Sequence, residues 1–223
     1  MTGAASVIAG SLAAALERAA TLDRPFRHHR LHGVLPAGLP EAVAALPVAA
    51  AAIGDTAGRR ETHNQLRIFF DPANRGRHAV CEFLAAALQD ASAVAAVERL
   101  CGVPLRGAYL RIEYCQDRAG FWLEPHTDIA AKKVTLLVYL SDDPGSDDWG
   151  TDIYDAALNP VARVPYRRNA GLAFVPGADT WHGFTKRPIA GVRKSLIVNY
   201  VDAGWRSRHE LSFPDHPVGT CKE

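Results

Sequence analysis

Cysteines are scarce in this sequence, and none is placed as in a disulfide framework or a zinc site. No Cys-x-x-Cys pair occurs among the four cysteines, which are Cys81, Cys101, Cys115 and Cys221. Disulfide-rich domains and zinc-binding domains have denser or more closely spaced cysteines. We therefore expect four reduced thiols.

An excess of charge of one sign is also missing. Twenty-five basic and 24 acidic residues leave a net charge of +1, whereas general nucleic-acid binders carry a strongly basic surface. No run approaches the roughly 20 apolar residues of a membrane span. The Ala-rich segment 1–16 lacks the basic start of a signal peptide, and Glu17 and Arg18 follow it directly. We expect a cytoplasmic protein that binds neither nucleic acid nor a membrane.

The 223 residues, of which 48% are hydrophobic, suit a single domain with a helical part and a strand-rich part. Residues 1–104 are mostly helical by periodicity, with helices expected at 6–20, 39–46 and 80–100 and short strands at 28–35 and 66–70. Residues 105–201 contain eight short runs rich in β-forming residues, separated by turn residues, at 107–115, 122–128, 134–140, 151–155, 162–166, 171–175, 180–185 and 192–201. This spacing predicts a sandwich or barrel core. The predicted protein is mainly β with flanking helices (α+β), and 202–223 form a C-terminal extension.

Three residues in the strand-rich half could bind one metal ion. His126 and Asp128 are separated by one residue, so on a strand both side chains point to the same face. His182 supplies a second imidazole from a distant strand. Two nitrogens and one carboxylate oxygen suit non-haem Fe(II) and leave coordination positions open.

An arginine near the last of these residues points to an acidic ligand. Arg193 and Ser195 share one face of a predicted strand, eleven and thirteen residues after His182. An arginine that faces a barrel interior is costly unless an anion meets it. A guanidinium fork beside a hydroxyl is well matched to a carboxylate. The pattern predicts a metal site that also binds a carboxylic acid.

Residues 105–201 resemble the Fe(II)/2-oxoglutarate-dependent dioxygenases, and more closely their prolyl-hydroxylase-like branch. The resemblance implies that His126, Asp128 and His182 bind iron on a double-stranded β-helix of the jelly-roll or cupin-like type. It also implies that four residues bind the 2-oxoglutarate cosubstrate. Arg193 matches the arginine that clamps the far carboxylate, and Ser195 matches the serine of an Arg-x-Ser pattern. Tyr139 matches a tyrosine that shares this carboxylate, and Tyr114 matches one that contacts cosubstrate near the metal.

This resemblance implies an oxidoreductase that hydroxylates a C–H bond of a small molecule. O2 and 2-oxoglutarate are consumed, and succinate and CO2 are released. Ascorbate is a candidate reductant. Because Asp128 is retained as a carboxylate, hydroxylation is expected rather than halogenation, whereas desaturation and epimerisation use the same ligands.

Three alternatives remain open at this point. The chain could hydroxylate a peptide or protein, or it could be a cupin-like metal-binding protein that does not use 2-oxoglutarate. A nucleic-acid demethylase is disfavoured by the near-neutral charge. Asn64, Arg67 and Arg111 are candidate substrate contacts, although surface salt bridges are the simpler interpretation of the two arginines.

Overall fold

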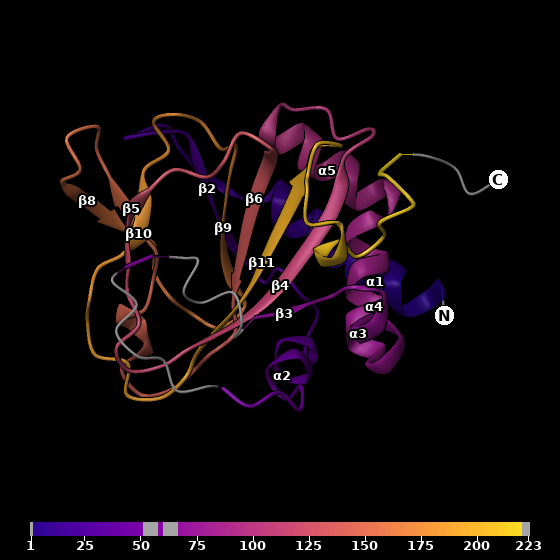
Figure 1. Ribbon diagram of the computed structural model, residues 1–223, viewed down its shortest axis with the longest axis horizontal. Coiled ribbons are helices and arrows are strands. Elements are labelled where there is room, and N and C mark those ends of the chain that lie inside the picture. Colours follow the sequence, from indigo (N-terminus) through magenta and orange to yellow (C-terminus); the bar gives the residue numbers. More distant parts are fainter. Residues whose placement is uncertain (1, 51–57, 60–66, 220–223) are drawn as a thin grey trace.

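The computed structural model describes residues 2–50, 58–59 and 67–219, and its core is built from two antiparallel sheets. The larger sheet has the strand order β1-β2-β9-β6-β11-β4-β3, and the smaller has the order β5-β10-β7-β8. In Figure 1 the smaller sheet lies to the left of the large sheet, and most of the helices lie to the right of the large sheet. Asn64, proposed as a substrate contact, and Cys221 lie outside the described residues.

The strands follow the predicted runs closely. The large sheet contains β1 (Ala20–Leu22), β2 (His28–His32), β3 (Ile68–Phe69), β4 (Tyr109–Asp117), β6 (Lys132–Tyr139), β9 (Ala170–Phe174) and β11 (Arg193–Val201). The small sheet contains β5 (Leu123–His126), β7 (Asp152–Tyr154), β8 (Pro160–Arg163) and β10 (His182–Phe184). Each of the eight runs expected in 105–201 therefore contains or overlaps a strand. The short strand β1 was not predicted.

Five α-helices precede β4 in the part of the chain that the structure describes. They are α1 (Thr2–Glu17), α2 (Leu39–Ala44), α3 (Pro72–Arg77), α4 (Ala79–Gln89) and α5 (Ala91–Cys101). The single helix expected over 80–100 is wrong, because the chain is extended at Asp90, whose carboxylate caps α5 by accepting a hydrogen bond from the Ser92 amide. Asp71 likewise precedes helix α3, and its carboxylate caps this helix by accepting a hydrogen bond from the Asn74 amide.

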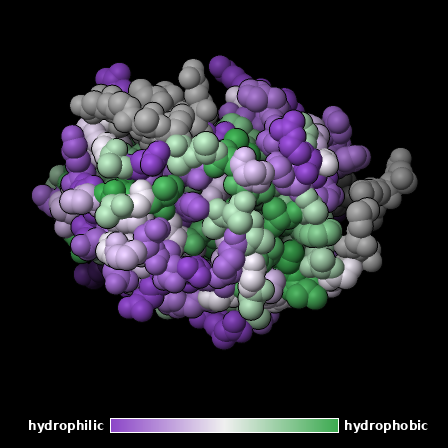
Figure 2. All heavy atoms as spheres, turned by 90° about the horizontal axis from the view of Figure 1, so that it is seen from below, coloured by the Kyte–Doolittle hydropathy of each residue, from purple (hydrophilic) through white to green (hydrophobic). Residues whose placement is uncertain are grey.

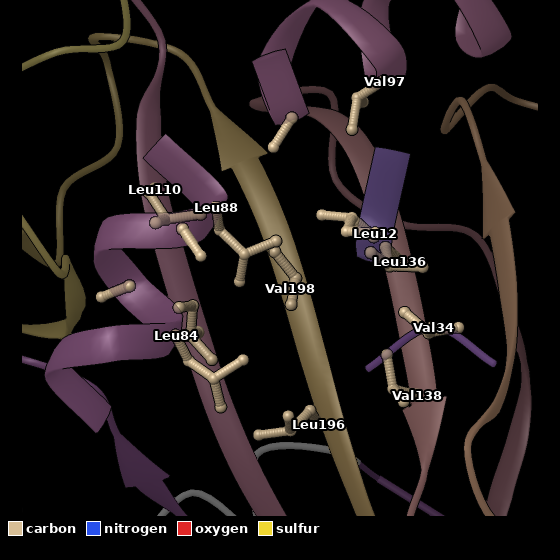
Figure 3. Packing of buried hydrophobic residues seen from close by; sticks show 14 of the residues in the cluster. Leu12, Val34, Leu84, Leu88, Val97, Leu110, Leu136, Val138, Leu196 and Val198 are labelled. Atoms are coloured by element: carbon tan, nitrogen blue, oxygen red, sulfur yellow. The ribbon is translucent and has the colours of Figure 1, made fainter. Parts of the chain in front are cut away.

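One face of the large sheet packs against helices and is apolar. Figure 3 shows Leu110, Leu136, Leu196 and Val198 from the strands meeting side chains of the helices, including Leu84 of α4. Side chains alternate along a strand, so the intervening residues of β4, β6 and β11 point to the opposite face, toward the small sheet. The candidate cosubstrate residues Arg193 and Ser195 of β11 lie on that second face.

One face of the molecule shows a mixed distribution of hydrophilic and hydrophobic residues. Seen from below Figure 1, hydrophilic residues surround scattered patches of hydrophobic ones (Figure 2). Among the described residues, no single helix is long and apolar enough to cross a membrane. Helices α4 and α5 pass that test only as a pair, with a bend of 58° between them.

Candidate metal and cosubstrate site

The two sheets bring the three expected metal ligands together. His126 ends β5 and pairs directly with His182, the first residue of the neighbouring strand β10. Asp128 follows two residues after the end of β5. One candidate ligand atom from each of the three residues lies within 4.8 Å of the other two. This is a suitable spacing for atoms that share one metal ion.

Both imidazoles are oriented by the same backbone contact. His126 Nδ1 lies 2.9 Å from the carbonyl oxygen of Glu124, and His182 Nδ1 lies 2.9 Å from that of Thr180. A carbonyl only accepts, so each Nδ1 carries the proton and each Nε2 keeps its lone pair for a metal. Metal-binding histidines in proteins are commonly oriented in this way. The donor set therefore fits Fe(II).

The carboxylate of Asp128 is held by two donors. Its Oδ1 accepts a hydrogen bond from Lys132 Nζ, and its Oδ2 accepts one from Thr135 Oγ1 at 2.6 Å. Thr135 in turn accepts from Asn199 Nδ2 at 2.9 Å. Each carboxylate oxygen has a second lone pair, so these contacts orient Asp128 and leave it able to bind a metal.

An inner cavity of about 50 Å³ extends from the three ligands into the space between the sheets. Arg193 lines it and is 6% exposed. Its Nε donates to the Trp149 carbonyl at 2.7 Å, and its Nη1 donates to Asp117 at 2.6 Å. Burial acts to lower the pKa of Arg193, but the negative charge of Asp117 raises it, so the guanidinium stays charged. A fixed cation thus lies in the same cavity as the metal ligands.

Two hydroxyl groups beside Arg193 also line this cavity. The Ser195 hydroxyl is buried, and no hydrogen-bond partner for it occurs among the described residues. Thr151 Oγ1 accepts a hydrogen bond from Tyr139 at 2.9 Å, which leaves its own proton available to the cavity. Thr151 was not identified from the sequence.

The two predicted tyrosines lie outside the cavity lining. Tyr139 is buried behind Thr151 and stacks on Tyr166, and burial raises its pKa, so it remains a donor. Tyr114 lies on the opposite face of the sheet, in the apolar cluster, with its hydroxyl 3.4 Å from the Ala44 carbonyl. The structure therefore does not bring Tyr114 to the metal ligands, because strand β4 turns its even-numbered residues toward the helices.

A buried ionic network adjoins the site and corrects the interpretation of Arg67 and Arg111 as surface residues. Arg67 is 8% and Arg111 is 4% exposed, and both form ion pairs with the fully buried Glu113, at 2.7 and 2.8 Å. Arg111 also contacts Glu210 at 2.5 Å and Asn199 at 3.1 Å. Hydrogen bonds thus run from Asp128 through Thr135 and Asn199 to this network.

A second, outer cavity of about 290 Å³ meets the inner one at His126, Asp128 and Leu123. Its lining includes the charged residues Arg59, Arg111, Glu124, Lys132 and Glu210 as well as apolar surface from Leu123, Ile129 and Trp205. The indole Nε1 of Trp205 is buried without a hydrogen-bond partner among the described residues. The C-terminal extension thus supplies part of this wall, which the sequence did not predict.

No protein-family model matches the sequence, and no curated protein matches it. Solved structures do match. A Pseudomonas putida prolyl-4-hydroxylase has a TM-score of 0.54 and 19% identity over 88% of this chain and 95% of its own. A Trichoplax adhaerens prolyl hydroxylase in complex with a hypoxia inducible factor peptide fragment has a TM-score of 0.57 and 14% identity, with 89% and 90% covered. The chain has their double-stranded β-helix fold.

A third match has a different reaction. The non-heme alpha ketoglutarate dependent epimerase SnoN from nogalamycin biosynthesis has a TM-score of 0.54 and 20% identity, over 96% of this chain and 91% of its own. These comparisons confirm the fold class predicted from the sequence, and the matching structures are of the kind that the resemblance named. A fold shared at such identities accommodates more than one substrate and outcome.

Proposed function

We propose that this protein is an Fe(II)/2-oxoglutarate-dependent dioxygenase that hydroxylates an unactivated C–H bond of a small molecule. One observation carries the proposal. Three candidate ligands converge at one end of a cavity that also contains the buried cation Arg193 and the Ser195 hydroxyl, which has no hydrogen-bond partner among the described residues. A molecule with a metal-chelating end and a distal carboxylate matches both features.

The residues of this chain would divide the work as follows. His126, Asp128 and His182 would hold iron, which supplies activation of O2 and oxidative decarboxylation of the keto acid when it is bound. Lys132 and Thr135 fix the position of Asp128. The contacts of both Nδ1 atoms fix the imidazoles, so little reorganisation is needed when the metal binds.

Arg193 would bind the far carboxylate of 2-oxoglutarate through guanidinium N–H groups that its two protein contacts leave available. Ser195 would donate its unpartnered hydroxyl to the same carboxylate. Thr151, whose oxygen already accepts from Tyr139, would donate a second hydroxyl proton. In this arrangement Tyr139 acts through Thr151, without touching the cosubstrate.

The substrate to be oxidised would occupy the outer cavity, beside His126 and Asp128. Its volume of about 290 Å³ suits a small molecule, at the lower end of ordinary ligand pockets. The charged residues in its lining favour a compound that carries polar groups. A peptide substrate is the second candidate, because the matching structures include prolyl hydroxylases.

An anaerobic titration tests the proposal directly. Fe(II) should bind first, and 2-oxoglutarate should then produce a weak visible charge-transfer band. Arg193→Ala should keep iron binding and lose the band at wild-type cosubstrate concentrations. Arg168→Ala, an exposed arginine paired with Glu41, is the matched control and should behave as wild type.

The outcomes separate the alternatives. Tight iron binding without a band at any 2-oxoglutarate concentration would favour a cupin-like metal protein and end the dioxygenase proposal. When the band forms, candidate compounds can be added and ranked by the shift they cause. A shift with proline-containing peptides and none with small hydrophilic compounds would replace the small-molecule assignment by peptide hydroxylation.

A further inference from the structure

The cation of the inner cavity already has an anionic partner. Asp117 ends β4, stands directly opposite Arg193 in the strand pairing, and is 5% exposed. Its Oδ2 accepts from Arg193 Nη1 at 2.6 Å, and the residue lines the same cavity. An incoming carboxylate on Arg193 would therefore lie close to a carboxylate of the protein itself.

Like charges this close in a buried setting repel strongly, since little water screens them. The orientation of Arg193, however, does not depend on Asp117 alone. The Trp149 carbonyl fixes the Nε side of the guanidinium, and aromatic rings of Phe184 and Phe121 flank it at 4.8 and 5.9 Å. A neutral amide in place of Asp117 would keep an acceptor for Nη1 and remove only the charge.

A second arginine adjoins this pair. Arg67 lines the inner cavity, and the charge of Asp117 is one of those that raise its pKa, although burial opposes this. Arg67 makes its ion pair with Glu113, two residues before Asp117 on the same face of β4. The cavity wall thus presents two cations, Arg67 and Arg193, with the anion Asp117 acting on both.

We propose that Asp117 is a competitor built into the cosubstrate site, which weakens the binding of 2-oxoglutarate to Arg193, and that Arg67 partly offsets this effect. The inference rests on the proposed function, because it assumes that Arg193 binds the far carboxylate. It assigns to Asp117 the setting of cosubstrate affinity. The effect is confined to keto acids that carry that second carboxylate.

Titrations of the full chain loaded with Mn(II), a redox-inert substitute for iron, test this without turnover. The two ligands are 2-oxoglutarate and 2-oxopentanoate, which has the same carbon chain and no far carboxylate. Asp117→Asn should bind 2-oxoglutarate at least about tenfold more tightly and 2-oxopentanoate within about twofold of wild type. Glu82→Gln is the control, because it neutralises a carboxylate of α4 that pairs with Arg75 of α3. It should leave the affinity for both ligands unchanged.

Arg67→Gln should change the affinity for 2-oxoglutarate in the opposite direction, and it leaves Asp117, the partner of Arg193, in place. It should weaken 2-oxoglutarate binding about fivefold and leave 2-oxopentanoate unchanged. It also keeps the proposal testable if Asp117→Asn does not fold, as judged by its thermal unfolding.

Any other result overturns one specific part of the proposal. Weaker 2-oxoglutarate binding by Asp117→Asn would mean that Asp117 positions Arg193 and does not compete. Equal tightening for both ligands would indicate a general effect on the metal. Unchanged binding in Arg67→Gln would remove the counter-charge role. If wild type with Mn(II) binds neither keto acid, the proposed function itself fails, which is a distinct outcome.

Discussion

The two faces of strands β4 and β11 are made by alternate residues of the same segments and have opposite character. Toward the helices they present Leu110, Ile112, Leu196 and Val198, all nearly inaccessible to solvent and part of one apolar cluster. Toward the small sheet they present charged and polar residues, namely Arg111, Glu113, Asp117, Arg193, Ser195 and Asn199.

The difference separates two tasks within one sheet. The helix-facing side buries apolar surface, which is the main source of folding free energy. The other side keeps desolvated charges that contribute less to stability and need partners. If this division holds, substitutions one residue apart should affect either binding or folding, but not both.

The largest effect is expected for a candidate metal ligand that lines the inner cavity. His182→Ala should weaken metal affinity by at least about 100-fold, since even residues behind the ligands change it by about 10–100-fold. The packed core does not include the metal, so thermal unfolding without metal should stay close to wild type. Calorimetric Mn(II) titration and thermal unfolding check both statements. Joint loss of folding and binding would contradict the separation and indicate a structural metal.

Leu196→Ala tests the opposite face of the same strand. Leu196 is 1% exposed among the apolar residues that meet the helices. Its truncation should lower the free energy of unfolding by about 2–5 kcal/mol, because buried methyl groups are lost and a cavity remains. Denaturant unfolding measures this change. Mn(II) affinity should stay within about twofold of wild type, and a tenfold loss would show that the two faces are coupled.

Ser195→Ala sharpens the comparison, because Ser195 is the chain neighbour of Leu196 and faces the other way. Its hydroxyl has no partner to lose in the structure, so unfolding should be unchanged to within about 0.5 kcal/mol. Binding of 2-oxoglutarate should weaken about tenfold, since a hydrogen bond to a charged group contributes about 1.5–3 kcal/mol. The Mn(II)-loaded chain again allows direct titration. Unchanged affinity would remove Ser195 from the proposed site.

The sequence predicted the inner face only in part, for a physical reason. Arg193 stood out because three potential metal ligands preceded it in a strand-rich region. Arg67 and Arg111 were named only as candidate substrate contacts, with surface salt bridges as the simpler interpretation, and Glu113 was not identified. Alternation of charged and apolar residues on a strand equally describes a solvent-exposed face. These three residues are buried because the small sheet and the C-terminal extension pack over them. These segments are distant in the sequence, so no local sequence pattern predicts the burial.

Local sequence patterns also led to two wrong predictions, the placement of Tyr114 at the metal site and a single helix across Asp90. Tyr114 suited a motif by its distance along the chain, but strand parity places it with Ile112 on the helix side. The apolar periodicity continues from α4 into α5, so it masks the interruption, whereas the capping carboxylate of Asp90 marks it. Alternation of side chains was the better guide for Arg193 and Ser195, which share the inner face as expected.

The smallest expected effect concerns pH and an inner-facing histidine of β2. Burial lowers the pKa of His28, whose ring lies against Phe26. The folded state thus favours the neutral ring, and the unfolded chain takes up the proton first as the pH falls below about 6.5. The stability that this contributes is present above that pH and is lost below it.

His28→Phe should therefore reduce the fall in the free energy of unfolding between pH 7 and pH 5.5. The reduction should be about 1 kcal/mol or less, because a single site contributes at most about 1.4 kcal/mol per pH unit. Denaturant unfolding of the metal-free chain at both pH values measures it. The other titratable groups are common to both proteins and cancel in the comparison. An identical pH dependence in the two proteins would show that the folded state does not favour the neutral form of His28, and the acid sensitivity would then belong to other groups.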